Sequence, residues 1–241
     1  MDELLDFKKE VYVEGEDCFL HYYPNFLAPS VAWDLFAAFC SHPKLDIAVP
    51  ERNPTLFDRH LNYVDMKCDA KVLSKLTYHR ESIKIFGKEY KQPRLTTWLG
   101  YFATAESKYR HIEKTVDFSP FLSRLVLVFK KEFARDFNSA LVNVYRSGQD
   151  GMGMHADDEP ILGEKPLILG LSLGGIRKLK FRLVENQRRK SSLADSLDIE
   201  CAHGSLVAMG GKLQSFYKHG VPKTKKDVPA RINLTFRNLK V

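Results

Sequence analysis

The feature that most constrains the fold is a series of short apolar or alternating segments in the second half of the chain. Turn residues separate these segments, notably Gly148, Asp150-Gly151, Gly174-Gly175, Gly204 and Gly210-Gly211. Many short strands divided by glycine turns are typical of a sandwich or a barrel. The predicted strands cover residues 141–146, 167–173, 178–184, 205–209, 216–219 and 232–236.

Helices are expected in the first half of the chain. Apolar residues recur at helical spacing from 31 to 39, directly after Pro29-Ser30, and Ser30 is the expected N-cap. A second helix is predicted to begin after Ser119, with Pro120 in its first turn, and to run to about Phe137. The polar-aromatic segment from about 44 to 92 is expected to be irregular, with a short helix near 71–79.

The composition is that of an ordinary globular protein, since 44% of the 241 residues are hydrophobic and 28% are charged. No apolar run approaches the ~20 residues that a membrane helix needs. The first ten residues, MDELLDFKKE, lack the profile of a secretory signal. We therefore expect an intracellular protein without membrane contact, in the cytoplasm or nucleus depending on the host.

The cysteine content and the net charge limit the kinds of metal site and binding partner that we expect. Cys18, Cys40, Cys68 and Cys201 are scattered, so reduced thiols are expected rather than disulfides or a cysteine-based zinc site. The net charge of +7 favours a polyanionic partner such as nucleic acid. A basic cluster at 223–226 is a candidate for phosphate contacts, or else a solvated loop.

Two histidines and one aspartate form a candidate metal site. Side chains two residues apart in an extended segment point the same way, so His155 and Asp157 can bind one ion. His219, near the end of a distant predicted strand, would be the third ligand. Two histidines and a carboxylate on one face are typical of non-haem Fe(II) oxygenases. A zinc hydrolase with a metal-bound water could use the same donors.

The wider pattern resembles the AlkB family of Fe(II)- and 2-oxoglutarate-dependent dioxygenases. The resemblance extends from about Pro93 to Arg237. The stretches that carry it are Asn143-Val-Tyr145, His155-Ala-Asp-Asp-Glu-Pro160, His219 and Arg231-Ile-Asn-Leu-Thr-Phe-Arg237, supported by Pro93-Arg-Leu-Thr-Thr-Trp98, Leu171-Ser-Leu-Gly174 and His203-Gly-Ser-Leu206.

The resemblance implies a mainly β, α+β fold, with a double-stranded β-helix (jelly-roll) core and supporting N-terminal helices. Residues 93–241 would form the dioxygenase core. Residues 1–92 would form an extension with a substrate-recognition region, packed on the core as one compact unit. We expect a monomer.

The resemblance also implies roles for the residues around the metal. By matching position, Arg231 would pair with the far carboxylate of 2-oxoglutarate, and Asn143 and Tyr145 would assist by hydrogen bonds. Arg237 would lie near the metal-bound carboxylate, and Asn233 would line the same cavity. Because Arg231, Asn233 and Arg237 are separated by even numbers of positions, one strand face can present all three.

The implied reaction consumes O2 and 2-oxoglutarate at Fe(II), releases CO2 and succinate, and hydroxylates a substrate carbon. The implied substrate is an N-alkylated nucleobase of the 1-methyladenine or 3-methylcytosine type in DNA or RNA, which loses its methyl group as formaldehyde. Such a base must leave the stack. His155 would form one wall of the base pocket, and Glu159, or in competition Asp158, would contact its exocyclic amino group. Tyr101 and Phe102 are candidates for the aromatic wall, with Tyr109 also available.

Three alternatives follow from the same residues. The stretch after Trp98 departs from the aromatic pattern of the most similar family members, so a member that acts on modified RNA, protein or lipid is the first. The second is a nucleic-acid-binding module that has lost turnover, although the complete ligand set and the arginine pair argue against it. The third is a zinc hydrolase, which has no use for Arg231 and Arg237.

Overall fold

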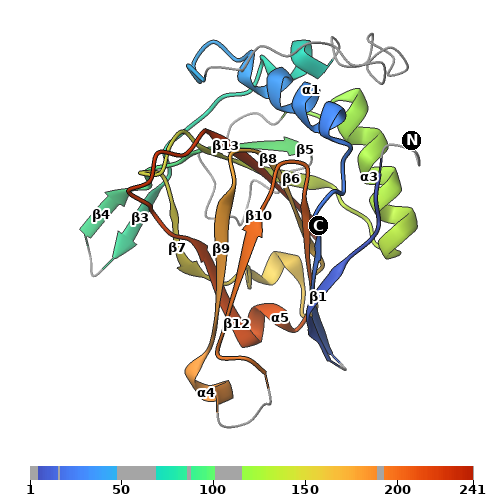
Figure 1. Cartoon of the computed structure of the whole chain (residues 1–241), viewed down its shortest axis with the longest axis vertical. Coiled ribbons are helices and arrows are strands. Elements are labelled where there is room, and N and C mark those ends of the chain that lie inside the picture. The colour runs from blue at the N-terminus through green and yellow to red at the C-terminus, as the bar shows by residue number, and fades with distance from the viewer. Residues whose placement is uncertain are drawn as a thin grey trace.

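The computed structural model describes residues 5–15, 17–47, 69–85, 88–100, 116–188 and 193–240. The chain is mainly β, and the pairings between its strands are antiparallel. Figure 1 shows two sheets facing one another, with the longer helices on the outside of one sheet. No helix in the described ranges combines the length and the apolar character needed to cross a membrane.

The larger sheet has seven strands and the smaller has four. In spatial order, the larger contains β1 (Glu10–Glu14), β2 (Cys18–Tyr23), β11 (Leu206–Gly211), β8 (Ile168–Gly174), β13 (Arg231–Arg237), β6 (Ser139–Tyr145) and β5 (Leu95–Gly100). The smaller contains β10 (Ser196–Cys201), β9 (Arg177–Leu183), β12 (Tyr217–Val221) and β7 (Met152–His155). A separate hairpin pairs β3 (Ser82–Ile85) with β4 (Lys88–Lys91).

The helices are few. The longer ones are α1 (Pro29–Cys40) and α3 (Pro120–Phe133), and the residues 69–73 are also helical. Single turns occur at η3 (Pro160–Leu162), α4 (Glu185–Arg188) and α5 (Leu213–Phe216). All six predicted strands are confirmed within two residues at each end, by β6, β8, β9, β11, β12 and β13.

The larger sheet separates two apolar clusters, because side chains alternate between its faces. On β6, Val142 and Val144 pack with α1 and α3 in the outer cluster, whereas Leu141 belongs to the cluster between the sheets. Phe129 of α3 contacts Phe236 of β13 edge to face, with ring centroids 5.1 Å apart. The helices therefore cover one face of the sheet and leave the other to face the smaller sheet.

The helix starts differ in part from the prediction. The N-cap of α1 is Ala28 and not Ser30, because Pro29 takes the first helical position and leaves Ser30 inside the helix. Ser119 does occupy the N-cap position of α3, but its side chain makes no capping hydrogen bond. The buried carboxylate of Asp69 accepts the hydrogen bond from the Phe121 backbone N–H instead, at 3.1 Å.

The helix ends also differ. α3 stops at Phe133 and not near Phe137, because Ala134 adopts a left-handed conformation with φ of 51°. The helix expected near 71–79 spans only 69–73, and His79 instead forms an isolated bridge with Thr96.

Gly174 is a position where the fold requires glycine. Its φ is +82°, and an added Cβ would lie 2.4 Å from the Ala230 carbonyl oxygen and 2.6 Å from the Phe36 ring. We expect Gly174→Ala to lower the free energy of unfolding by about 1–3 kcal/mol, because it adds backbone strain and a clash. Gly153→Ala is the matched control, since nothing lies within 4 Å of its added Cβ. Urea unfolding of both variants tests this, and equal stabilities would contradict it.

Candidate metal centre and adjoining cavity

The pairing of β7 with β12 builds the candidate metal centre. His155 and His219 are direct partners in this pairing, so both imidazoles project from the same face of the smaller sheet. Asp157 follows β7 by two residues. The possible ligand atoms of the three residues lie within 4.8 Å of one another. Among the described residues, this is the group of histidine, cysteine and acidic side chains that could hold a metal ion.

The spacing within this group suits coordination better than direct bonding. Asp157 Oδ1 lies 3.8 Å from His155 Nε2, and Asp157 Oδ2 lies 3.9 Å from His219 Nε2. These separations are too long for hydrogen bonds. A metal ion with bonds of roughly 2.0–2.2 Å to nitrogen and oxygen can lie between such atoms.

The protonation of the histidines also suits a metal. Burial, followed by the neighbouring imidazole of His155, lowers the pKa of His219 to about 3. His219 is therefore neutral near pH 7, as a metal ligand must be. In His155, Nδ1 lies 3.0 Å from the Gly153 carbonyl oxygen, so this nitrogen carries the proton and donates it. Nε2 is then left as the ligand atom.

Asp157 is held in place at two points. Arg237 Nη2 donates to its Oδ1 at 2.7 Å, and both side chains are buried. The backbone N–H of Asp157 donates to Gln214 Oε1 at 3.0 Å. The carboxylate and its backbone are thus fixed by different elements, β13 and α5.

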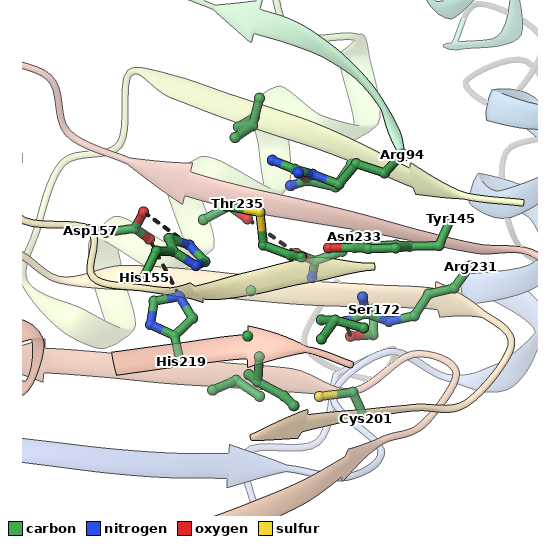
Figure 2. A pocket seen from close by; sticks show the side chains of 18 of the residues that line it. Arg94, Tyr145, His155, Asp157, Ser172, Cys201, His219, Arg231, Asn233 and Thr235 are labelled. Carbon is green, nitrogen blue, oxygen red and sulfur yellow. Dashed lines mark hydrogen bonds and ion pairs between the residues drawn. The ribbon is translucent and has the colours of Figure 1, made fainter. Parts of the chain in front are cut away.

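A cavity between the two sheets leads away from these three residues (Figure 2). His155, Asp157 and His219 line one end, and Tyr145, Ser172 and Arg231 also line it. Figure 2 shows the second set displaced along the strands from the first. The cavity therefore connects the three candidate ligands with Arg231.

Arg231 is a buried cation that lacks a neutralising acid among the described residues. The residue is 2% exposed, and Nη2 donates to Ser172 Oγ at 2.9 Å. Its guanidinium lies over the Tyr145 ring, 5.3 Å from the centroid. Nε and Nη1 are buried, with no hydrogen-bond partner in the described ranges. Burying unpaired donors and a charge is costly, so this end of the cavity is suited to an anionic ligand.

The other predicted co-substrate residues line the same cavity. Asn143 and Asn233 are direct partners in the pairing of β6 with β13. Arg231, Asn233 and Arg237 all lie on the cavity face of β13, as their even spacing of two and four residues predicts. Asn233 Nδ2 donates to the Leu171 carbonyl at 3.0 Å, which fixes its amide.

Arg94 also lines the cavity, although its sequence context predicts no role for it. It is buried, and Nε donates to Asn143 Oδ1 at 2.7 Å, while Nη1 is buried with no partner among the described residues. Because Oδ1 of Asn143 accepts this bond, its Nδ2 is the atom left to donate into the cavity. The available signal was the two-residue spacing of Arg94, Thr96 and Trp98, which would place them on one face of an extended segment.

Further residues were also missed. Ser172 and Cys201 line the cavity, and Gln214 bonds Asp157 from outside it. Serine, cysteine and glutamine have no spacing pattern of their own, and each reaches the site through long-range pairing.

The residues predicted to bind the substrate are not grouped around the cavity as the metal and co-substrate residues are. Asp158 is exposed and Glu159 is half-buried at the start of η3, and neither is among the residues that line the cavity. Tyr101, Phe102 and Tyr109 lie outside the described residues. The lysines of 223–226 are exposed in the segment that follows β12.

Comparison with known proteins agrees with this geometry. The family model of the 2OG-Fe(II) oxygenase superfamily matches residues 19–237. The chain is 35% identical over 156 residues to alpha-ketoglutarate-dependent dioxygenase alkB homolog 3 of Bos taurus. The aligned region covers 62% of this chain and 53% of that protein. The chain is 32% identical over 182 residues to DNA oxidative demethylase ALKBH2 of Arabidopsis thaliana, which covers 67% and 58%.

The mouse (Mus musculus) DNA oxidative demethylase ALKBH2 is 28% identical over 202 residues, covering 75% of this chain and 83% of that protein. The chain spans about half the length of the alkB homolog 3 proteins that it matches. These relatives confirm the resemblance to the AlkB family, and the name of the matched superfamily gives the expected metal and co-substrate. The chain belongs to the 2OG-Fe(II) oxygenase superfamily.

Proposed function

We propose that this protein is an Fe(II)- and 2-oxoglutarate-dependent dioxygenase that removes methyl groups from N-alkylated nucleobases in DNA or RNA. The substrates would be of the 1-methyladenine and 3-methylcytosine type, and the products would be formaldehyde, succinate and CO2. One observation carries the proposal: a His-Asp-His group and a buried arginine with unpaired donors line a single cavity. The similarity to a DNA oxidative demethylase supports the substrate class, and the similarity to alkB homolog 3, an alpha-ketoglutarate-dependent dioxygenase, supports the co-substrate.

The residues present fit both the metal and the co-substrate. His155, Asp157 and His219 would hold Fe(II), which supplies the position where O2 and 2-oxoglutarate react. Two histidines and one carboxylate leave ligand positions open for this purpose. Arg231 would bind the far carboxylate of 2-oxoglutarate through the nitrogens that now lack partners.

Several polar residues would orient 2-oxoglutarate along the cavity. Tyr145 and Asn143 would donate hydrogen bonds to it, and Asn233 would line its path. Arg237, which already bonds the Asp157 carboxylate, would lie beside the carboxylate that binds the metal. Arg94, directly before the edge strand β5, would add a donor, since its Nη1 is buried without a hydrogen-bond partner among the described residues. These contacts fix the co-substrate before any reaction, which is the protein's contribution to such chemistry.

The alkylated base would approach the metal past His155. The His155 side chain is 29% exposed whereas that of His219 is 8% exposed, so the opening of the site lies on the His155 side. Glu159 would contact the exocyclic amino group of the flipped base, with Asp158 as the competing residue. Tyr101 and Phe102 would supply the stacking wall. The net charge of +7 favours the phosphates of the nucleic acid.

The fold and organisation proposed with this function follow the same family. The two facing antiparallel sheets would form a double-stranded β-helix, or jelly-roll, with the dioxygenase residues in 93–241. Residues 1–92 would add substrate recognition and supporting helices, packed on the core as one unit, and we propose that the protein acts as a monomer inside the cell.

The primary test measures turnover. With Fe(II), ascorbate and 2-oxoglutarate, we expect oligonucleotides that carry 1-methyladenine or 3-methylcytosine to stimulate release of succinate and formaldehyde together. An unmethylated oligonucleotide is the control and should release no formaldehyde. Absence of 2-oxoglutarate turnover under every metal condition would contradict the dioxygenase assignment. If formaldehyde were released only from another class of substrate, the nucleobase assignment would be wrong.

Arg231→Ala tests the co-substrate assignment. Loss of the paired charge should raise the 2-oxoglutarate concentration at half-maximal decarboxylation roughly 100-fold or more. Metal affinity should remain close to that of the wild type, because Arg231 makes no contact with the three ligands. Arg124→Ala, on the exposed face of α3, is the control for loss of an arginine. An unchanged 2-oxoglutarate requirement would exclude the assigned role of Arg231.

Glu159→Ala tests the substrate side separately. We expect the variant to change its preference between methylated adenine and methylated cytosine. The surroundings of the exocyclic amino group differ between these two bases, and Glu159 is the residue proposed to contact that group. Decarboxylation of 2-oxoglutarate without substrate should stay intact. The measurement is formaldehyde release from the two methylated oligonucleotides, with Asp158→Ala as the comparison variant. A preference identical to that of the wild type in Glu159→Ala would show that Glu159 does not contact the base.

A further inference from the structure

We propose that Gln214 is a positioning residue: its side chain binds the backbone N–H of Asp157 and so holds Asp157 in place as a metal ligand. This inference rests on the proposed function, because it assumes that His155, Asp157 and His219 bind a metal ion. Gln214 belongs to α5, the single helical turn between β11 and β12, and it contributes no ligand atom itself.

The need for such a residue arises from where Asp157 lies. The two histidines lie on paired strands, whose hydrogen bonds set the positions of their backbones. Asp157 lies beyond the end of β7, in a segment without regular secondary structure. A buried backbone N–H there has no strand partner and must find its acceptor elsewhere. The acceptor is Gln214 Oε1 at 3.0 Å, from a residue 57 positions away in sequence.

The Gln214 amide is itself oriented. A backbone N–H can only donate, so the oxygen of the amide must face Asp157 and its nitrogen must face away. That nitrogen lies 3.6 Å from the sulfur of Met209, a weak acceptor on β11. Gln214 and Met209 are both buried, which shields these contacts from bulk solvent.

The turn that carries Gln214 is anchored at its start by the connection between β1 and β2. The Lys212 backbone N–H donates to the Asp17 carbonyl at 2.7 Å, and Lys212 Nζ lies 2.7 Å from Asp17 Oδ2. Lys165 Nζ meets the same carboxylate at 2.6 Å. The acceptor for Asp157 is therefore attached to the connection between β1 and β2, which does not contribute to the metal centre.

Gln214 and Arg237 act on different parts of Asp157. Arg237 bonds the carboxylate, so it sets the direction of the ligand oxygen. Gln214 bonds the main chain, so it sets the distance of the residue from β7 and from both histidines. Without the Gln214 acceptor, the buried N–H of Asp157 would seek another partner, and the backbone would move. Loss of partners that orient metal ligands typically weakens metal affinity about 10- to 100-fold.

The experiment titrates purified, metal-free protein with Co(II), a redox-stable probe for the Fe(II) site, and follows its absorption spectrum. Gln214→Leu keeps a similar side-chain size but removes the acceptor, and Gln214→Glu keeps an acceptor oxygen. Leu213→Ala is the matched control: it lies on the same turn, is buried in the cluster between the sheets and makes no bond to Asp157. Circular dichroism and thermal unfolding check that each variant is folded.

We expect Gln214→Leu to bind Co(II) about 10- to 100-fold more weakly than the wild type, with an altered spectrum. Gln214→Glu should retain most of the affinity. Leu213→Ala should unfold at a lower temperature yet bind Co(II) as the wild type does. The reverse result overturns the inference: wild-type affinity and spectrum in Gln214→Leu, or an equal loss of affinity in Leu213→Ala.

A further variant separates this inference from the proposed function. His219→Ala should abolish Co(II) binding if the three residues form the metal site. If wild type and His219→Ala bind Co(II) equally, the proposed metal centre fails and the inference fails with it. If only the Gln214 result is negative, the metal centre stands and Gln214 has no part in positioning its ligand.

Discussion

The antiparallel pairing of β7 with β12 is the interaction on which the candidate site depends, because it places His155 opposite His219. A shift of one residue in this register would turn one imidazole to the outer face of the sheet. The register shifts between His219 and Val221, on the Met152 side of this pair, and β7 itself ends at His155. Asp157 can then leave the strand and reach back to the same point.

The larger sheet adds the second half of the site on the same principle. Every second residue of β13 faces the cavity, which gives Arg237 beside the metal ligands and Arg231 further along the strand. The separation of the two arginines is fixed by the rise of one strand and does not depend on loops. The rigid backbone of β13 therefore sets the length of a ligand that binds the metal at one end and Arg231 through an acidic group at the other.

Much of this could be predicted from the sequence, because strand parity is a local property. The alternation in 232–236 placed Arg231, Asn233 and Arg237 on one face, and the glycine turns located six of the strands. The two-residue spacing brought His155 and Asp157 together for the same reason. The resemblance supplied what parity could not, namely the expected roles of Arg231 and Arg237 toward the co-substrate.

The remainder depends on contacts between segments far apart in the chain. Asp69 caps α3 from 52 residues away, Arg94 orients Asn143 from 49 residues away, and Gln214 holds Asp157 from 57 residues away. None of these pairs has a spacing signal, since a polar side chain that completes one buried hydrogen bond looks like any other in sequence. β7 was also missed, because Met-Gly-Met-His has only four residues, contains a glycine and shows little alternation of apolar and polar residues.

The aromatic layer beneath the helices has a consequence for the evolution of the site. Phe236 packs against Phe129 on one face of β13 while its neighbours Thr235 and Arg237 face the cavity on the other. A change in ring size on the helical side would displace the backbone that both faces share. Co-substrate geometry is therefore inherited together with the helix packing, and substitutions in α3 and in β13 would have to be accepted as compatible pairs.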